Sequence, residues 1–585
     1  MIRSSRVWIC GILLAVLAVV LVTDQILKNS AIGKDISQTL WGLNILHYSK
    51  ILEKLSRSNQ QALEREILQA RGEDLLPEPV LSHATGFYPG GLSLTITLPD
   101  NTQAYYTLDG SIPTRGDILV DGPIQLSNST ALRVRAFNGS ASSDAVNATY
   151  IVEQPPQATV VAIVMDPVHL FDKHSGIYSN PNQTGRGWER PADITFLDPL
   201  LNARLQAEVR VRIHGGASRG LPNQGRKNFR VYVGREEADL RAWMSYPETI
   251  AVHQSQWVLR HVPVENQLWS DRFAQRLARQ LGIAVSSARP MVLYLNGVRW
   301  GVYDLMERIN KAFLAGKEAG PKFDLLRGSV LINPDKANPR FASWNSLYRE
   351  IADSDLKDPR QYARVAAKFD IDRLIDYYAL SIFLADSDRP HHNIDLYRSR
   401  KSEPEEPGQW KFAAWDFDHG LNYRGRYATV DSLAWHLRSQ PRPDLKLSGS
   451  PDTSNMVTST TLLRSLMQNP EFRTRFVRRF HELLATTFSP DNLRRTFQAV
   501  LEDYAGVIEL ERERFENQQY WLLENIVKAR ITPTGYTYDH RMQEIYDFLD
   551  IRTKVIERAL IEHFGPLPEQ GTQGQSSRLF DHYSG

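Results

Sequence analysis

Oxygen-bearing side chains gather in two short stretches of the sequence, and their types and spacing suit phosphate chemistry. Asp388 and Asn393 stand five residues apart in the segment Asp-Arg-Pro-His-His-Asn, and Asp416 and Asp418 follow an apolar stretch. Phosphoryl transfer needs a carboxylate near the attacking hydroxyl and further oxygen ligands that hold magnesium against the phosphates. Magnesium prefers such hard donors. These four residues are therefore candidates for a phosphate-transfer site.

The elements around these residues predict that folding brings the two stretches together. Apolar residues at helical spacing predict an amphipathic helix over 371–383 with one face in the core. Pro390 forbids continuation of this helix, so the polar residues after it lie on a loop. Residues 394–398 and 410–415 then predict a β-hairpin, which delivers Asp416 beside that loop.

The order of these elements resembles that of protein kinases. Asp388 and Asn393 match the Asp-x-x-x-x-Asn spacing of the kinase catalytic loop, and Asp416-Phe417 stands where Asp-Phe-Gly would. Upstream, residues 210–220 predict a strand that runs into a glycine-rich turn, which can offer backbone N–H groups to phosphates. A strand bearing cations follows over 226–233. Two further strands meet at an Asn-Gly turn at 296–297, a strong hairpin signal, and lead to Glu307.

Four stretches together resemble the spore-coat protein H (CotH) kinase family, whose members are atypical secreted kinases with a reduced kinase fold. They are Arg-x-His-Gly-Gly-Ala-Ser-Arg, the Lys-Asn-Phe-Arg strand, Leu-Tyr-Leu-Asn-Gly-x-x-x-Gly-Val-Tyr-x-Leu-x-Glu and Trp-Asp-Phe-Asp. The resemblance covers about 155–565 and implies ATP-dependent phosphorylation with Mg²⁺ or Mn²⁺. By position, Asp388 matches the catalytic aspartate, and Asn393 and Asp416 match metal-binding residues. Asp418 is a candidate second aspartate ligand of the metal.

The same resemblance suggests which residues bind the nucleotide. The candidates are Arg212, Gly215, Ser218, Arg219, Lys227, Glu307 and Trp415. Lys227 is the preferred partner of the phosphates, but Arg226, Arg230 and Arg219 compete for that role. Glu307 could equally form an ordinary salt bridge, and an aromatic residue such as Trp415 at the end of a buried strand is more often part of the core.

The N-terminus predicts export. Arg3 and Arg6 precede fifteen uncharged residues, Trp8 to Val22, and Asp24 closes the run. Such a run is typical of a signal sequence. The lack of a nearby small-x-small cleavage motif favours an uncleaved transmembrane anchor with its basic end in the cytoplasm. The rest of the chain would then be periplasmic or at the cell surface, or secreted if the segment is cleaved.

Composition argues against a nucleic-acid partner. The 585 residues include 69 Lys and Arg against 67 Asp and Glu, so the chain has no overall electrostatic field that would attract DNA or RNA. The only cysteine, Cys10, lies in the N-terminal apolar run. The folded part of the chain therefore has no disulfide, which suits an oxidising compartment without proving one.

Residues 76–153 have a different character from the rest. Strand signals and turns dominate, and the pattern Tyr-Thr-x-Asp-Gly-Ser-x-Pro-Thr at 106–114 resembles the small β-sandwich appended to chitobiases and β-hexosaminidases. In such proteins this module is usually an accessory. We expect a structural spacer, with contact to a cell-surface glycan as the alternative.

The predicted fold class is α+β: an atypical bilobal protein-kinase-like domain, preceded by a transmembrane anchor, a helical stalk and a small β-sandwich. The expected divisions are an anchor over 1–24, a stalk over 25–75, a β-sandwich over 76–153, a β-rich N-lobe over 155–339, a helical C-lobe over 340–568 and a disordered tail over 569–585.

The leading functional hypothesis is an exported kinase that phosphorylates a protein or glycan hydroxyl. A catalytically inactive pseudokinase, or structural envelope protein, that serves assembly or glycan attachment is the main alternative. Glycoside hydrolysis is suggested only by the β-sandwich. It would require two carboxyl groups facing a sugar groove.

Overall fold

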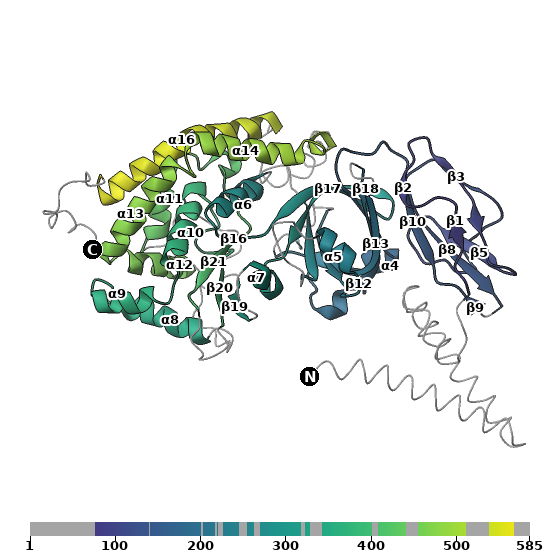
Figure 1. Cartoon of the computed structure of the whole chain (residues 1–585), viewed down its shortest axis with the longest axis horizontal. Helices are drawn as coiled ribbons and strands as arrows, with labels where there is room; N and C mark the ends of the chain where they lie inside the picture. Colours follow the sequence, from purple (N-terminus) through teal and green to yellow (C-terminus); the bar gives the residue numbers. More distant parts are fainter. Residues whose placement is uncertain are drawn as a thin grey trace, which may run out of the picture. The chain divides into compact units, whose positions relative to one another are not determined.

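The computed structural model describes most of the chain between residues 76 and 566 (Figure 1). The described ranges are 76–139, 141–199, 203–216, 219, 226–244, 254–261, 269–317, 322–327, 342–400, 408–439, 454–510 and 538–566. The expected anchor, stalk and tail lie outside these ranges, as does Ser218. Within them, no helix combines the length and the apolar character needed to cross a bilayer.

The chain divides by its internal contacts into two compact units. The described part of the first unit comprises 76–84, 91–150 and 165–179. The described part of the second comprises 85–90, 151–164 and everything from 180 onward. Sheets and helices both contribute, which confirms the predicted α+β class.

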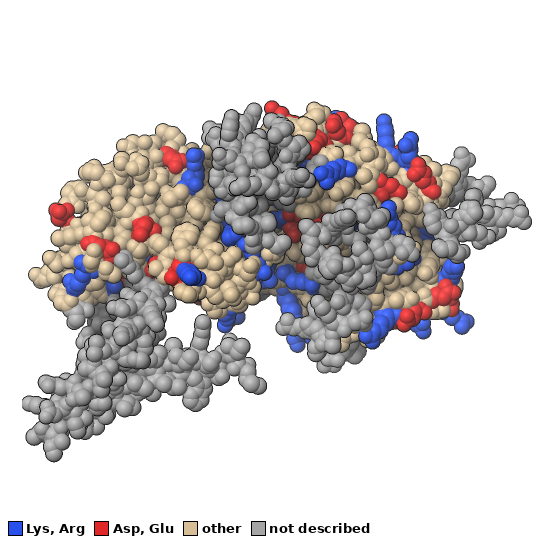
Figure 2. Space-filling view, turned by 180° about the vertical axis from the view of Figure 1, so that it is seen from behind, with Lys and Arg blue, Asp and Glu red and all other residues tan. Residues whose placement is uncertain are grey.

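The surface that the structure describes mixes charges of both signs. Figure 2 shows Lys and Arg side chains interspersed with Asp and Glu on the visible face. Among the residues drawn in colour there, basic side chains form no continuous stripe.

The first unit is built almost entirely of short antiparallel strands. Its main sheet has the order β10-β8-β5-β6, and β9 pairs with β8. Two further strand pairs, β1-β4 and β3-β7, belong to the same unit. The bounds are β1 (Val80–Leu81), β3 (Leu92–Leu94), β4 (Ile96–Thr97), β5 (Gln103–Thr107), β6 (Ile118–Leu119), β7 (Ile124–Leu126), β8 (Thr130–Asn138), β9 (Ala141–Ser142), β10 (Val146–Ile151) and the short helix α4 (Pro167–Phe171). The strand β2 (Gly86–Phe87) belongs to the segment 85–90.

The Asp-Gly-Ser turn of this unit has a structural explanation. The carboxylate of Asp109 accepts hydrogen bonds from the backbone N–H of Ser111 at 2.9 Å and from its hydroxyl at 2.6 Å. Gly110 between them has a φ of 86°, which glycine adopts without strain. The motif that carries the β-sandwich resemblance therefore closes a tight turn within the module.

The second unit begins with a closed β-barrel of seven strands in the order β11-β12-β13-β14-β15-β18-β17. The bounds are β11 (Val160–Val164), β12 (Arg190–Asp198), β13 (Ala203–His214), β14 (Asn228–Val233), β15 (Gln256–His261), β17 (Ala288–Leu295) and β18 (Val298–Glu307). All neighbours are antiparallel except β11 and β17, whose parallel pairing closes the barrel. Two short helices, η1 (Arg186–Trp188) and α5 (Ala238–Met244), lie in its connections.

The predicted hairpin at Asn296-Gly297 is confirmed as the turn between β17 and β18. Both residues have positive φ angles, 49° and 80°. A two-residue turn with two positive φ angles matches the twist of the flanking strands, and Asn-Gly adopts it readily. This hairpin directs the chain back across the barrel to Glu307.

A four-stranded sheet and a set of helices form the rest of the second unit (Figure 1). The sheet order is β16-β21-β20-β19, with β16 (Ala284–Val285), β19 (Phe323–Leu326), β20 (Asp395–Ser399) and β21 (Lys411–Ala414). The helices are α6 (Ser270–Gln280), α7 (Lys311–Lys317), α8 (Ala342–Asp353), α9 (Pro359–Ala366), α10 (Ile371–Leu384), η4 (Tyr423–Gly425), α11 (Ser432–Leu437), α12 (Ser454–Leu466), α13 (Pro470–Ala485), α14 (Pro490–Tyr504) and α16 (Tyr538–Phe564). The sheet thus combines strands from both sides of residue 340.

Helix α10 forms the centre of this helical part. The carboxylate of Asp370 caps it by accepting from Arg373 N at 3.2 Å. The sequence predicted one buried face, but every residue from Leu374 to Leu384 is buried. The reason is that α10 packs against β21 on one side and against α6, α11, α13 and α16 on others.

Helix α16 is joined to the chain around α10 by a buried arginine. Arg552 is 0% exposed, and its guanidinium donates to the carbonyl oxygens of Val430 at 2.6 Å, Phe383 at 2.7 Å and Ile382 at 3.0 Å. Burial lowers the pKa of Arg552 to about 9, because a charged guanidinium loses hydration there. The carbonyl oxygens compensate for that loss, so this side chain connects three segments of the lobe.

Replacement of Arg552 by methionine should destabilise the second unit strongly. The carbonyl oxygens would remain buried without donors, and each unsatisfied group costs about 1–3 kcal/mol. We expect a loss of at least about 3 kcal/mol, measured as the shift of the urea unfolding midpoint. Arg558→Met is the matched control, since Arg558 is exposed on the same helix and should change stability by less than about 0.5 kcal/mol. Equal effects of the two variants would contradict the role of Arg552.

Candidate functional site

The loop after α10 is shaped by a buried carboxylate. The helix ends at Ala385, which has a φ of 49°, and the fully buried Asp386 follows it. The Oδ1 atom of Asp386 accepts from the backbone N–H of Asp388 at 2.9 Å, and its Oδ2 atom lies 3.5 Å from Arg389. Burial raises the pKa of Asp386 to about 6, against the opposing charge of Arg389. These contacts fix the position of the Asp388 backbone.

A buried arginine holds this loop against the one that follows β21. Arg389 is 1% exposed and donates to the carbonyl oxygens of Trp415 at 2.6 Å, Asp416 at 3.3 Å and Asn393 at 3.3 Å. Its guanidinium also lies 3.5 Å from the ring centroid of Phe417. The structure therefore brings the two predicted stretches side by side, as the helix-loop-hairpin order predicts.

Asp388 pairs with a histidine from the second loop. Its Oδ1 atom lies 3.1 Å from Nδ1 of His419, whose ring stacks on Tyr423 at 4.3 Å. Burial favours a neutral imidazole, but the hydrogen bond and charge of Asp388, with the charge of Asp418, raise the pKa of His419 to about 9. Burial likewise disfavours the Asp388 carboxylate, yet the protonated His419 lowers the pKa of Asp388 below its usual value. These opposite shifts favour a carboxylate beside an imidazolium.

Arg260 of the barrel strand β15 extends into the acidic side of this site. Its Nη2 atom lies 2.7 Å from Asp416 Oδ1 and 3.0 Å from Asp418 Oδ2, and its Nη1 atom lies 3.0 Å from Asp271 Oδ2. The other oxygen of Asp271 accepts from the backbone N–H of Phe417 at 2.8 Å. Helix α6, which carries Asp271, is thereby connected both to the barrel and to the loop after β21.

The carboxylates of Asp416 and Asp418 both contact the Nη2 atom of Arg260, so the two acidic groups share one cationic partner. Burial and the charge of Asp416 raise the pKa of Asp418 to about 8, against the opposing charge of Arg260. Two carboxylates held this close favour either a proton or a cation between them. Asn393, with a φ of 57°, adjoins the same loop through Arg389. The donor set fits a hard metal ion, although no three His, Cys, Asp or Glu side chains of the described residues form a ready-made metal centre.

A cluster of arginines lies on the barrel side. Burial, then the charges of Arg230 and Arg327, lower the pKa of Arg308 to about 9. Burial also lowers the pKa of Arg230, and the charges of Arg212 and Arg327 contribute. The Nε atoms of Arg212, Arg230 and Arg308 are buried and have no hydrogen-bond partner among the described residues. A bound anion would stabilise the charged forms of Arg230 and Arg308 against burial and the neighbouring positive charges.

His214 connects this arginine cluster with Arg260. Burial keeps the pKa of His214 well below its usual value, and so do the surrounding positive charges of Arg230, Arg308, Arg260 and Arg212. Its Nδ1 atom accepts from Arg230 at 2.6 Å. The charges of the arginine cluster and of Arg260 therefore act on the same histidine.

The glycine-rich turn and its cations are partly engaged in local contacts. Gly215 has a φ of 127°, which favours glycine at that position. Lys227 Nζ donates to the carbonyl of Arg219 at 2.9 Å, and burial lowers its pKa. Arg226 is buried and pairs with His261 at 3.0 Å. Of the competing cations named from the sequence, Arg230 and not Lys227 lies in the arginine cluster.

Two other predicted nucleotide-binding residues have clear structural contacts. Glu307 is 3% exposed, and its carboxylate accepts from Ser287 N at 3.1 Å. Trp415 is half-buried and packs against the small apolar cluster around α7 that includes Phe313. Both residues thus make hydrogen-bond or packing contacts within the fold. These contacts do not test whether either residue binds nucleotide.

Four charged residues of this site could not be named from the sequence. Arg260 and Asp271 lie on a strand and the helix that follows it, an order typical of the lysine-glutamate pair of protein kinases. In this chain arginine stands in place of the lysine, and aspartate in place of the glutamate. Arg308 and Arg327 lie outside any motif, and only their shared position in space shows the cluster.

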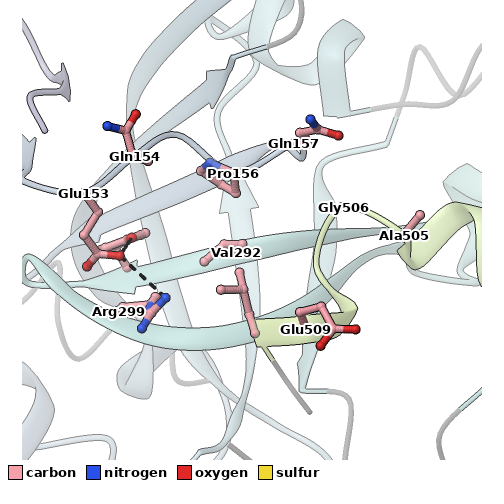
Figure 3. Close-up of a pocket in the computed structure, with 11 residues that line it drawn as sticks. Glu153, Gln154, Pro156, Gln157, Val292, Arg299, Ala505, Gly506 and Glu509 are labelled. Atoms are coloured by element: carbon pink, nitrogen blue, oxygen red, sulfur yellow. Dashed lines mark hydrogen bonds and ion pairs between the residues drawn. The ribbon is translucent and has the colours of Figure 1, made fainter. Parts of the chain in front are cut away.

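The structure also has a pocket away from this site, of about 290 Å³, in which none of the predicted site residues participates (Figure 3). Glu153 Oε2 accepts from the hydroxyl of Tyr294 at 3.1 Å and lies 3.6 Å from Arg299. The remaining lining residues include Gln154, Pro156, Gln157, Val292, Ala505, Gly506, Glu509 and Leu510. Its acidic and basic groups already neutralise each other in part, so it offers no comparable array of charge.

Comparison with protein families agrees with both resemblances. A family model described as CotH kinase protein matches residues 211–556, more than half of the chain. A model of the chitobiase/β-hexosaminidase C-terminal domain matches residues 83–148. A search among curated proteins found no match. The first of these models spans the barrel from β13 onward, the four-stranded sheet and both loops of the site. The chain therefore belongs to the CotH kinase protein family.

Proposed function

We propose that this chain is a membrane-anchored, extracytoplasmic kinase that transfers the γ-phosphoryl group of ATP to a hydroxyl of a protein or glycan. The observation that carries the proposal is the separation of charge within the site. On the acidic side, Asp416 and Asp418 of the loop after β21 pair with Arg260, and on the basic side the arginines of the cluster act on His214. A nucleotide with its metal ion complements both sides.

The arginine cluster is suited to the phosphates of the nucleotide. Guanidinium groups bind phosphate oxygens through paired N–H donors, and Arg212, Arg230 and Arg308 each bury an Nε atom that has no partner among the described residues. Asp416 and Asp418, with Asn393 beside them, would hold a divalent ion, which neutralises phosphate charge when bound. Arg260 would keep the two carboxylates aligned from the barrel side.

In this proposal Asp388 receives the acceptor hydroxyl. The imidazolium of His419 orients its carboxylate and keeps it ionised. The hydroxyl oxygen would form a bond to the γ-phosphorus while the bond to the bridging oxygen of ADP breaks. The Asp388 carboxylate would accept the hydroxyl proton, and the products would be the phosphorylated acceptor and ADP.

A catalytically inactive role has one observation in its favour. Arg260 already places a positive charge between Asp416 and Asp418. A pseudokinase could retain this ion-pair network for stability alone. The two functions differ in whether metal and nucleotide bind, and in whether Asp388 matters once they are bound.

Metal-dependent nucleotide binding should depend on Asp416. For the wild type, ATP with Mg²⁺ at about 100 times the Kd should stabilise the protein by about 2.7 kcal/mol, seen as a rise in Tm. ATP without Mg²⁺ should give a smaller rise. In Asp416→Ala the effect of Mg²⁺ should disappear, because a carboxylate ligand is lost, while Asp353→Asn, an exposed acid on α8, should behave as the wild type. No response of the wild type would favour the inactive alternative.

Phosphate transfer should depend on Asp388 without an equal effect on binding. We expect Asp388→Asn to lower kcat by about 10²–10⁴-fold, because an amide cannot accept the hydroxyl proton. The Kd for ATP should change by less than about threefold. Transfer of labelled γ-phosphate, or ATP hydrolysis without acceptor, measures the rate. A variant with wild-type turnover would remove Asp388 from the mechanism.

A further inference from the structure

A second concentration of arginines lines a pocket of about 380 Å³ between α6 and α14. These two helices lie side by side (Figure 1). The lining residues are Arg276, Arg279, Gln280, Asn492, Arg495, Thr496 and Ala499. The lining thus contains three guanidinium groups, three neutral hydrogen-bonding side chains and no carboxylate.

The positive charge of this pocket is only partly neutralised by its surroundings. Arg276 pairs with Asp503 at 2.7 Å and donates to the carbonyl of Ala499 at 3.2 Å. Asp503 also lies 3.8 Å from Arg272, which has Asp304 at 3.9 Å as a second partner. Arg495 is exposed and forms no ion pair with any residue that the structure describes. A single carboxylate therefore serves more than one guanidinium.

The walls of the pocket are held in place by hydrogen bonds between the two helices. Asn492 Nδ2 donates to Gln280 Oε1 at 2.8 Å, and Gln280 Nε2 donates to Thr496 Oγ1 at 3.0 Å. Arg279 donates to Ser287 Oγ at 3.2 Å. Because these bonds fix the side chains at the base, a ligand would meet a pocket whose shape is largely set.

We propose that this pocket binds a small anion that carries phosphate groups. Planar guanidinium groups match phosphate oxygens in pairs, and arginine is the preferred residue for such recognition. A single phosphate ion would fill only part of the volume, so a diphosphate or a phosphorylated small molecule is the better fit. This site is separate from the arginine cluster of the barrel, and the inference does not require that the chain be an active kinase.

Binding at this pocket would act on the helix that supports the candidate active site. Asp271 lies in the first turn of α6, and its carboxylate accepts a hydrogen bond from Gln275 Nε2 at 2.9 Å. Gln275 Oε1 in turn accepts from Arg272 at 3.1 Å. The pocket and Asp271 therefore share helix α6.

The test uses inorganic pyrophosphate as the probe, with the full chain in a low-salt buffer that contains a metal chelator. Backbone hydrogen exchange locates binding, and calorimetry measures its Kd. We expect slower exchange over 270–280 and 490–504 on addition of pyrophosphate. Arg495→Gln should weaken binding at this site by about tenfold and sharply reduce that protection when pyrophosphate is near the wild-type Kd. Because Arg495 is exposed, this change should not impair folding.

Arg494→Gln is the matched control, since it removes the same charge from the neighbouring position of α14. Arg494 pairs with Asp550 of α16 and does not line the pocket. It should leave protection of α6 and α14 unchanged. Equal losses in both variants would show general attraction of anions and overturn the proposal, as would protection confined to 203–233.

A comparison with citrate at equal ionic strength tests the choice of phosphate. Citrate carries a similar charge on carboxylates, so weaker protection of α6 and α14 by citrate supports phosphate recognition. Equal or stronger protection by citrate would contradict it. No protection of these helices by pyrophosphate in the wild type would show that the pocket binds no such ligand.

Discussion

The candidate site depends above all on the buried guanidinium of Arg389. It binds carbonyl oxygens from both loops and lies against the ring of Phe417, so that two segments more than twenty residues apart share one set of contacts. A buried charge is costly unless its donors are satisfied. The arrangement in which the carbonyl groups of both loops face this side chain is therefore favoured. Asp388 and Asp416 are positioned by that arrangement, and the carbonyl of Asp416 is itself one of the groups that Arg389 binds.

The charged side chains of the site are divided between the two parts of the second unit. The helical part supplies carboxylates on loops, and the barrel supplies guanidinium groups from its strands. Arg260 and Asp271 connect the two parts, because Arg260 extends from β15 and Asp271 lies on α6. Arg212, Arg230 and Arg260 come from three different strands, β13, β14 and β15, and Arg308 directly follows β18.

Local sequence patterns predicted the elements around the site. They could not predict contacts between residues that lie far apart in the chain. The helix before Asp388, the hairpin before Asp416 and the Asn-Gly turn were evident from apolar spacing and turn residues. Closure of the barrel was not, since β11 pairs with β17 more than a hundred residues away. The two-residue strand β16 is too short to give a pattern. Arg260 and Arg308 were missed because single arginines carry no signal until folding places them beside carboxylates or one another.

The contacts of α16 have a consequence for synthesis of the protein. Arg552 follows Phe383 by 169 residues, and Val430 by 122, yet it provides donors for the carbonyl groups of both. At about 5–20 residues per second, a ribosome needs roughly 10–30 s to add the longer of these segments. Throughout that interval the nascent helical part lacks one of its internal supports. Its apolar surfaces would have to be kept from aggregating during that time, either inside a translocation channel or by binding to a chaperone.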